Sequence, residues 1–333
     1  MPSFTDATVV PNVARALLGL LSERGLSLER VCRGLGFSHS DLMDPNVRLS
    51  YRQNRLLITR AQRGALDPAL GLSTGARQSP LAWGIAGLAM LVSETLGDAI
   101  AYGLDHQGES GALLEHHATT LRDEMVVEVT PKVFDLEIEP FLVEEAFSSA
   151  VAVVRCLVGP GYSPNRIELA YPRPAHADAY ARFFQCPVRF ATGANRMFSN
   201  SRWLKTRLPG YDAAMCGPLR TELDALLKQP AGRSDLLESL SNRLRSGVDE
   251  RQALNEVAQQ LNMSERTLRR RLVELKVSYR QLLDDVRHER AQDLLHSTTM
   301  TVREVAQAVG FADARSFRRA FKRWTGVLPG SSR

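Results

Sequence analysis

Two segments near the end of this 333-residue chain each carry a row of arginines with a short hydroxyl side chain beside it. The guanidinium fork of arginine can bind O6 and N7 of a guanine in the major groove, and it also pairs with phosphate. Hydroxyl groups near a helix N-terminus often meet base edges. These residue types therefore favour the reading of double-stranded DNA. The residues expected to contact DNA are Arg266, Thr267, Arg269, Arg270, Arg315, Ser316, Arg318, Arg319 and Lys322.

Two copies of one sequence pattern must position these side chains, in residues 254–276 and 302–326. Glu256-Val-Ala-Gln259 in the first copy recurs as Glu304-Val-Ala-Gln307 in the second. A short helix, a tight turn and an arginine-rich helix together make a helix-turn-helix motif. The sequence therefore predicts two such motifs in tandem.

Capping and turn residues stand where a helix-turn-helix needs them. Ser264 is at the position of a helix N-cap. Asn262 and Gly310 occupy the turns, where a left-handed backbone favours glycine or asparagine. Ala258 and Ala306 are small at the point where the two helices of each motif cross. The recurrence at matched positions carries more weight than any one of these signals.

The arginine-rich helices also have an apolar face, which should pack against the preceding helix. Its members follow the spacing i, i+4, i+7 and are Leu268, Leu272 and Leu275 in the first copy and Phe317, Phe321 and Trp324 in the second. For a single helix of this kind, a basic face that only meets solvent would be the favoured interpretation. Two matched copies favour DNA binding instead, with about half of the arginines holding phosphates.

A linker helix is predicted between the two motifs, over Tyr279–His296. Such a helix is about 27 Å long, and successive major-groove turns lie roughly 34 Å apart on one side of DNA. One chain could therefore place both arginine faces in adjacent turns, on an asymmetric site. Arg287 and Arg290 on this helix could touch phosphate or pair with a neighbouring carboxylate, and the structural role is favoured. The carboxylates in reach are those of Asp284, Asp285 and Glu289.

The positive charge of the chain lies in the same region. Residues 233–333 contain 19 lysines and arginines against 13 aspartates and glutamates, whereas the rest of the chain has a net charge of −1. This distribution indicates a polyanionic partner for the last part of the chain alone.

The preceding residues combine helices with strands. Residues 11–110 are predicted to be mainly helical. Residues 112–120 and 124–129 are predicted to form a hairpin, and Phe141–Val158 a buried helix. We expect an α+β sensory domain in residues 1–228, a linker in 229–234, and an all-α DNA-binding domain in 235–333, in which the linker helix joins two helix-turn-helix units.

The first domain shows no pattern typical of an enzyme. His116 and His117 would point to opposite faces of a strand and could not share a metal. Glu144 and Glu145 are interpreted as acids near a helix start, which favour the helix dipole. Three tyrosines could line a ligand pocket, but packing in the core is favoured: Tyr162, Tyr171 and Tyr180. We predict no enzymatic activity, no cofactor and no metal.

Three features that are absent from the sequence indicate the cellular compartment. The chain has no run of 18 apolar residues and no secretory signal at its start. No pair of cysteines has the spacing of a zinc site. A cytoplasmic protein with reduced thiols and no membrane partner is expected. The cysteines are Cys32, Cys156, Cys186 and Cys216.

The tandem motifs resemble the DNA-binding domain of the AraC/XylS family of bacterial transcription regulators. The residues that carry this resemblance are Glu256-Val-Ala258, Met263-Ser264, Leu268, Arg270, Arg290-Ala291, Leu294-Leu295, Glu304-Val-Ala306, Gly310-Phe311, Phe317, Phe321-Lys322, Gly326 and Pro329. The resemblance implies that one groove is met by the residues Arg266, Thr267, Arg269 and Arg270. It implies that the next groove is met by Arg315, Ser316 and Arg319.

The first domain resembles the sensory domain called arabinose-binding-like, found in the subgroup of the ornithine-utilisation regulator. The matching stretches are Gly25–Leu28, Leu70–Leu72, Thr95–Ile100, Phe184–Phe190 and Asn195. This resemblance implies effector sensing or dimerisation.

The combined prediction is a sequence-specific transcription regulator, an activator, controlled by an unidentified small-molecule effector. Double-stranded DNA and RNA polymerase are the expected macromolecular partners, and a homodimer is an open alternative to a monomer. Two other functions are considered. An enzyme tethered to DNA would need a catalytic constellation in the first domain. An architectural DNA binder would show equal affinity for any sequence.

Overall fold

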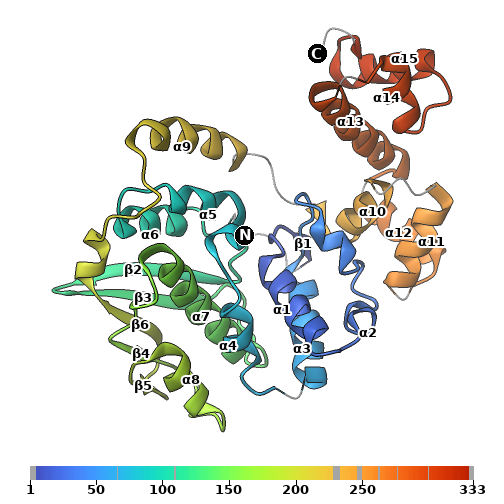
Figure 1. Ribbon diagram of the computed structural model, residues 1–333. Helices are drawn as coiled ribbons and strands as arrows, with labels where there is room; N and C mark the ends of the chain where they lie inside the picture. Colours follow the sequence, from blue (N-terminus) through green and yellow to red (C-terminus); the bar gives the residue numbers. More distant parts are fainter. Residues whose placement is uncertain are drawn as a thin grey trace. The chain divides into compact units, whose positions relative to one another are not determined.

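The computed structural model describes residues 5–65, 67–108, 110–227, 233–245, 250–261, 263–275, 277–298 and 300–329. Within these residues the chain forms two compact units, one from residues 1–32 and 38–232 and one from residues 33–37 and 233–333 (Figure 1). Most of the expected linker, residues 229–232, lies outside the described residues, as does the turn residue Asn262. The predicted domain limits stay a prediction.

The first part of the first unit is helical, as predicted. Short 3₁₀ helices at Ser40–Met43 and Pro80–Trp83 and a short strand, β1 (Asp6–Ala7), accompany the α-helices. The α-helices are α1 (Asn12–Glu23), α2 (Leu28–Cys32), α3 (Tyr51–Ala65), α4 (Leu70–Gly75), α5 (Gly84–Leu91) and α6 (Leu96–Asp105). Amphipathic spacing explains α1, because Leu17, Leu18 and Leu21 fall on one face and are fully buried.

A five-stranded sheet forms the other part of this unit among the described residues, in the order β2-β3-β6-β4-β5. Its strands are β2 (Leu114–Leu121), β3 (Glu124–Pro131), β4 (Arg166–Glu168), β5 (Val188–Arg189) and β6 (Asn195–Asn200). The predicted hairpin is confirmed, and Arg122 adopts a positive φ of 54° in its turn. Neighbouring strands are antiparallel except β4 and β5.

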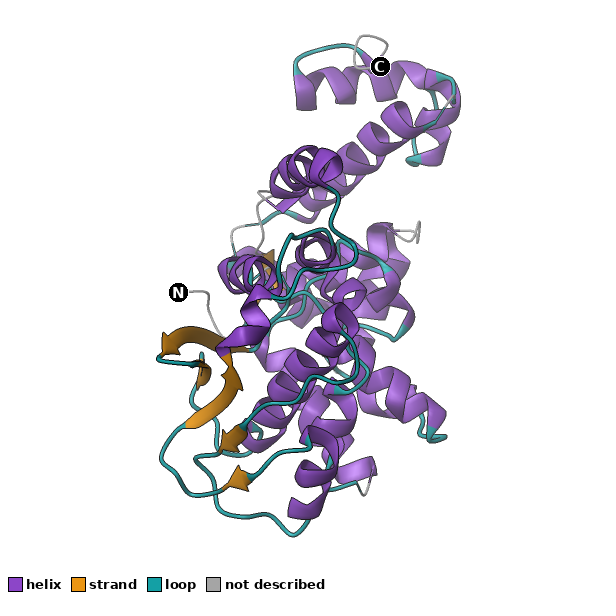
Figure 2. Ribbon diagram, turned by 60° about the vertical axis from the view of Figure 1, so that its left-hand side comes forward, coloured by secondary structure: helices purple, strands orange, loops and turns teal. Residues whose placement is uncertain are grey.

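Figure 2 shows the strands on one side of the unit and the helices gathered against them. The long helix α7 (Glu139–Val158) packs against both α4 and β2. Close approach to α4 depends on glycine, because a Cβ at Gly75 would collide with the backbone of α7 at Glu145 and with the Ser148 hydroxyl. The predicted buried helix is confirmed, with its start at Glu139 and not Phe141.

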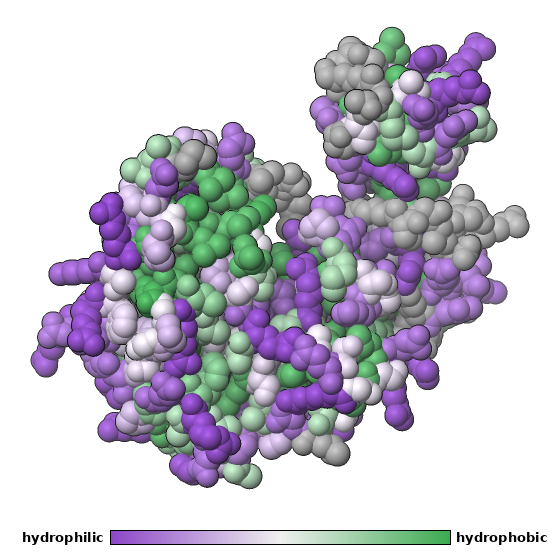
Figure 3. Space-filling view, viewed as in Figure 1, coloured by the Kyte–Doolittle hydropathy of each residue, from purple (hydrophilic) through white to green (hydrophobic). Residues whose placement is uncertain are grey.

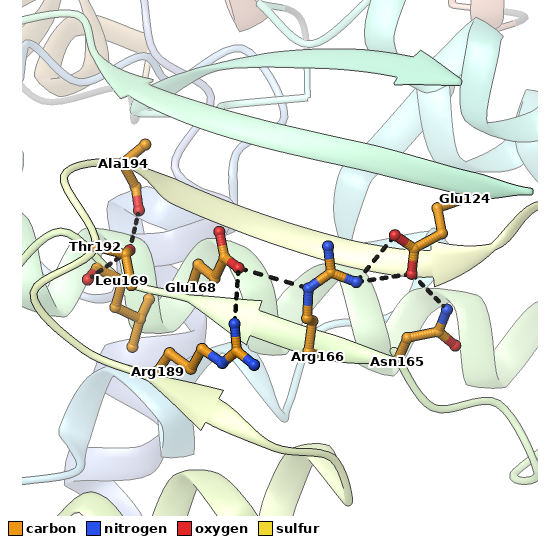
Figure 4. A network of polar contacts seen from close by, with 8 residues as sticks. All are labelled: Glu124, Asn165, Arg166, Glu168, Leu169, Arg189, Thr192 and Ala194. Carbon is orange, nitrogen blue, oxygen red and sulfur yellow. Dashed lines mark hydrogen bonds and ion pairs between the residues drawn. The ribbon is translucent and has the colours of Figure 1, made fainter. Parts of the chain in front are cut away.

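Charged side chains tie the strands of the sheet together (Figure 4). Arg166 on β4 donates to Glu124 on β3 at 2.8 Å and lies 3.5 Å from Glu168. Asn165 also donates to Glu124, at 2.9 Å. The Arg166 guanidinium stacks over the Phe198 ring of β6 at 3.6 Å from its centroid. These contacts fix the register of three strands on the face that is open to solvent.

Three more elements complete the first unit: α8 (Ala177–Phe184), a 3₁₀ helix at Ser201–Lys205, and α9 (Ala213–Leu227). Helix α9 packs on α5 through Leu223, and Tyr102 of α6 donates to Asp224 at 2.6 Å. An apolar surface lies over α5 and α9 in Figure 3. Leu81 and Leu88 are exposed there.

The second unit is helical, apart from the short strand β7 (Arg233–Ser234). Its helices are α10 (Asp235–Arg245), α11 (Glu250–Gln260), α12 (Glu265–Glu274), α13 (Tyr279–Ser297), α14 (Val302–Ala308) and α15 (Ala314–Thr325). The predicted pair of helix-turn-helix motifs, α11–α12 and α14–α15, and the helix between them are confirmed. No helix within the described ranges has the length and apolar character needed to cross a membrane.

Candidate DNA interface and ligand cavity

Helix α12, the reading helix of the first motif, is positioned by a cap and an apolar face. The Ser264 hydroxyl accepts from the Thr267 amide at 3.2 Å, as a helix N-cap does. Leu268 and Leu272 are buried in the core of this motif. The expected burial of Leu275 is wrong, because α12 ends at Glu274 and Leu275 is 42% exposed. The apolar face therefore ends one turn earlier than its sequence spacing suggested.

The opposite face of α12 presents Arg266, Arg269 and Arg270 to solvent. Arg269 pairs with Glu265 at 2.8 Å, and Arg270 lies 3.6 Å from Glu274. Exposed pairs of this kind contribute about 0.3–0.5 kcal/mol. A guanine or a phosphate can therefore replace these carboxylates at small cost.

Helix α15, the reading helix of the second motif, is built in the same way. Asp313 is its N-cap and accepts from the Ser316 amide at 2.8 Å. This hydrogen bond lowers the pKa of Asp313 from its ordinary value. Gly310 in the preceding turn has the left-handed φ of 80° that was predicted. Phe317 and Phe321 are fully buried. The exposed face carries Arg315, Arg318, Arg319 and Lys322.

The two short hydroxyls that were expected near bases have partners inside the chain. Thr267 Oγ1 lies 2.9 Å from Ser264 Oγ, and the Ser316 hydroxyl donates to Asp313 at 2.8 Å. Both side chains are partly exposed. Their role at DNA stays a prediction, and in the structure each hydroxyl contacts the N-cap side chain of its own helix.

Helix α13 belongs to the cores of both motifs. Leu282 and Val286 in its first half are buried with the residues of the first motif. Ala291 and Leu295 in its second half are buried with those of the second. A capping box fixes its start, since the Ser278 hydroxyl accepts from the Gln281 amide at 3.1 Å. One continuous helix therefore belongs to both of the cores that support the arginine faces of α12 and α15.

Polar contacts fasten α13 to the second motif. Arg287 donates to the carbonyl oxygen of Gly310 at 3.3 Å and stacks over the Phe311 ring at 5.1 Å. Arg323 of α15 pairs with Asp284 at 2.8 Å. Arg287 thus has the structural role that was favoured, but through a carbonyl oxygen and an aromatic ring of the second motif and not through the carboxylates expected.

A polar groove of about 600 Å³ lies between α13 and α15. Arg280, Arg319 and Arg323 line it, together with Ser316. Sequence reasoning missed Arg280 and Arg323 because they lie outside the arginine rows of the two reading helices. The signal that could have found them is an arginine within the segment that carries the positive charge of the chain.

A cavity of about 110 Å³ lies in the first unit, between α6, α7 and the sheet. Its walls are mainly apolar and include Ile100 and Leu104 of α6, Leu142 and Val153 of α7, and Met125 of β3. An apolar cavity with a few polar groups is a common form of ligand site.

Glu145 and His116, both in the cavity wall, have pKa values shifted from the ordinary ones. Glu145 of α7 is 7% exposed and accepts from the Gln78 amide at 3.3 Å. Burial raises the pKa of Glu145 to about 7. His116 of β2 has a buried Nδ1 without a hydrogen-bond partner. Burial, and then the charge of Lys132, lower the pKa of His116 to about 4. The ring is therefore neutral near pH 7.

The expected helix-start role of Glu144 and Glu145 is wrong. Helix α7 begins at Glu139, so both residues lie further along it and are buried. Glu144 accepts from the Tyr180 hydroxyl and lies 2.7 Å from Nε2 of His176. Glu145 faces the cavity instead. The signal that could have found them is a pair of acids inside an apolar run.

The neighbouring histidines and tyrosines divide between cavity, core and surface. His117 is exposed while His116 faces the cavity, so the predicted alternation along β2 is confirmed. Tyr162 lines the cavity and its hydroxyl lies 2.8 Å from Ser199 Oγ. Tyr171 and Tyr180 bond to each other at 3.0 Å, away from the cavity. Among the residues described, no group of three or more metal-ligating side chains is present.

Family models match both halves of the chain. The arabinose-binding domain of AraC transcription regulators matches residues 25–208, and a helix-turn-helix domain matches residues 257–333. The ornithine utilization regulator of Pseudomonas aeruginosa is 32% identical over 99% of this chain and 98% of its own length. The chain belongs to the AraC family of transcription regulators. The predicted resemblance to this family and to the ornithine-utilisation subgroup is confirmed.

Further relatives of this AraC-family protein are regulators too. VqsM of Pseudomonas aeruginosa is 28% identical over 77% of the chain and 81% of its own length. The crystal structure of the regulator CdpR from the same species aligns with 96% of this chain and 97% of its own, with 24% identity and a TM-score of 0.46. The matched domains and relatives are transcription regulators, which confirms the prediction of a DNA-binding regulator and not an enzyme.

Proposed function

We propose that this AraC-family regulator reads an asymmetric DNA site with both arginine faces, one in each of two successive major-groove turns. The observation that supports this is the sharing of α13 by both cores. With 19 residues, α13 is about 28 Å long, close to the roughly 34 Å between successive major-groove turns.

The side chains divide between bases and phosphates in this proposal. The base readers are proposed among Arg266, Thr267, Arg269, Arg270, Arg315, Ser316, Arg318, Arg319 and Lys322. Arg280 and Arg323, in the groove between α13 and α15, are proposed to hold phosphates, because the groove is polar and basic.

Effector control is proposed to act through the cavity of the first unit. A ligand that binds one arrangement of the chain better than another shifts the population toward the first. We propose that the regulator is cytoplasmic, where its DNA partner lies, and that it activates transcription through RNA polymerase. A homodimer is proposed as its assembly, because the resemblance of the first domain implies effector sensing or dimerisation.

Binding to DNA fragments from the region beside the gene tests the proposal directly. Fluorescence anisotropy should give a dissociation constant at least 10³-fold lower for one fragment than for random duplex at the same salt concentration. The logarithm of the binding constant should fall linearly with the logarithm of salt concentration for both. Equal affinity for all duplexes would show an architectural DNA binder instead.

A further inference from the structure

We propose that the cavity of the first unit binds a small primary amine with a compact apolar body, whose ammonium group pairs with the Glu145 carboxylate. This inference rests on the effector control proposed above and names the chemical class of the effector.

Glu145 is the group that selects a cation. Burying a carboxylate is costly unless it is paired with an opposite charge or with several hydrogen-bond donors. Within the described residues, the hydrogen bond recorded for Glu145 comes from the Gln78 amide at 3.3 Å, which is long for a charged acceptor. An ammonium group would supply the missing positive charge and up to three donors.

The unpartnered nitrogen of His116 is a second observation that points to a ligand. Its Nδ1 is shielded from solvent and has no hydrogen-bond partner, and the ring lines the same cavity as Glu145. Buried polar atoms in native proteins are nearly always satisfied. A neutral imidazole nitrogen can accept a hydrogen bond, so a ligand that donates hydrogen bonds suits both Glu145 and His116.

The rest of the wall disfavours an acidic or zwitterionic ligand. Among the described residues that line the cavity, none is a lysine or an arginine. His116 is neutral near pH 7, since burial lowers its pKa to about 4. Lys132, whose charge reaches His116, donates to the carbonyl oxygen of Ala112 at 2.8 Å. A ligand carboxylate inside the cavity would meet the like charge of Glu145, so an amine without a carboxylate suits the wall better than an amino acid does.

The volume of the cavity indicates the size of a suitable probe ligand. A dry protein cavity of about 150 Å³ holds benzene, with its six carbon atoms. By proportion, the cavity of about 110 Å³ here holds roughly four to five non-hydrogen atoms. Isobutylamine has this size and fits the apolar contacts offered by Leu104, Leu142 and Met125.

The raised pKa of Glu145 also explains how a carboxyl group can be buried in a mainly apolar wall. Burial raises the pKa of Glu145 to about 7, so the carboxyl is partly protonated near neutral pH. An arriving ammonium group favours the ionised form and displaces that proton.

Three ligands of similar size test the proposal on the full chain. Binding of isobutylamine, isobutanol and isobutyrate is measured by calorimetry at pH 8. Isobutylamine should bind at least about 10-fold more tightly than isobutanol, and isobutyrate should bind most weakly. Equal binding of amine and alcohol, tighter binding of isobutyrate, or no binding of any of the three at about 10 mM would overturn the proposal.

The Glu145→Gln variant assigns the effect to one side chain. It should lose the preference for isobutylamine while still binding isobutanol, which reports an intact cavity. Glu115→Gln, a change of the same kind at an exposed position of β2, should keep the wild-type preference. A Glu145→Gln protein that still prefers the amine would contradict the assignment. A variant that fails to fold leaves the ligand series on the wild-type chain as the deciding test.

DNA binding on the same preparations separates this inference from the proposed function. Specific DNA binding without an amine preference would overturn the amine inference alone. Loss of sequence preference in DNA binding would overturn the proposed function, whatever the cavity binds. Amine binding that leaves DNA binding unchanged would support the ligand class and contradict effector control.

Discussion

The guanidinium group of Arg287 on α13 lies 3.3 Å from the carbonyl oxygen of Gly310, in the turn between α14 and α15. The same group stacks over Phe311, the next residue of that turn. The turn that sets the direction of α15 is thereby attached to the helix that also packs against the first motif.

Replacing Arg287 with alanine should loosen the second motif. The lost hydrogen bond and stacking should lower the free energy of unfolding by about 1–2 kcal/mol. Urea unfolding of the full chain measures this change. Arg303→Ala, which removes an exposed arginine of α14, should change stability by less than about 0.5 kcal/mol. An equal effect of both substitutions would show that charge and not the Gly310 contact matters.

Arg270→Ala tests a proposed base contact. If the Arg270 fork binds one guanine, its loss should cost about 1–3 kcal/mol of binding free energy on the specific site and relax the preference at a single base pair. Anisotropy titrations against duplexes substituted at each position measure both effects. Equal weakening on every sequence would assign Arg270 to a phosphate.

Arg280→Ala should weaken DNA binding without changing the sequence preference. Arg280 belongs to α13 and lines the groove between α13 and α15, so we expect it to contact a phosphate and not a base. Its loss should weaken binding to specific and random duplexes by the same factor. The slope of log binding constant against log salt should fall by about 1. A change in sequence preference without a change in slope would be inconsistent with a phosphate contact.

Glu145 should make stability depend on pH. Its folded-state pKa of about 7 lies above the ordinary value of 4.5, so the folded state holds the proton more tightly. The resulting stabilisation is present below pH 4.5 and is lost as pH rises through about 7, by up to ~3 kcal/mol. Urea unfolding between pH 5 and 8 measures this loss.

The Glu145→Gln variant isolates this contribution from the neighbouring groups. Gln78 donates to Glu145, and His116 and Tyr162 are the other titratable side chains of the described cavity wall. His116 titrates with the opposite sign because its folded-state pKa of about 4 is lowered, and burial raises the pKa of Tyr162 above its ordinary value, outside this pH range. The wild type should lose more stability than the variant between pH 5 and 8. Parallel pH profiles of the two proteins would rule out a raised pKa at Glu145.

Gly75→Ala should destabilise the first unit. A Cβ there would meet the α7 backbone at Glu145, which cannot move away cheaply. Overpacking of this kind costs about 1–3 kcal/mol, measurable by urea unfolding. Gly64, an exposed helical glycine of α3 where an added Cβ would make only an ordinary contact of 3.7 Å with Leu26, is the matched control. Gly64→Ala should be neutral or slightly stabilising, and equal losses in both variants would refute the packing argument.

The second unit could be predicted from sequence because its determinants are local. Caps such as Ser264, the turn glycine Gly310 and the apolar spacing of each reading helix lie within a few residues of one another. The exception is Leu275, where a periodic pattern continued past the last turn of α12. Periodicity alone does not say where a helix ends.

The cavity of the first unit could not be predicted because its residues come from distant parts of the chain. Glu145 is buried because α4 approaches α7 closely at Gly75, and His116 reaches the cavity from β2. Neither contact leaves a short-range pattern. The acids of α7 therefore looked like ordinary helix-start residues.

Helix α13 also limits how the length of this chain can change. Adding one residue to an α-helix turns everything after it by about 100° and advances it by about 1.5 Å. If both arginine faces read one side of the duplex, as proposed, a single insertion in α13 would turn the arginines of α15 away from that side. Only an insertion close to two whole turns, about seven residues, restores their common direction. The phase of α13 would then make the interval between the two proposed DNA segments resistant to gradual change.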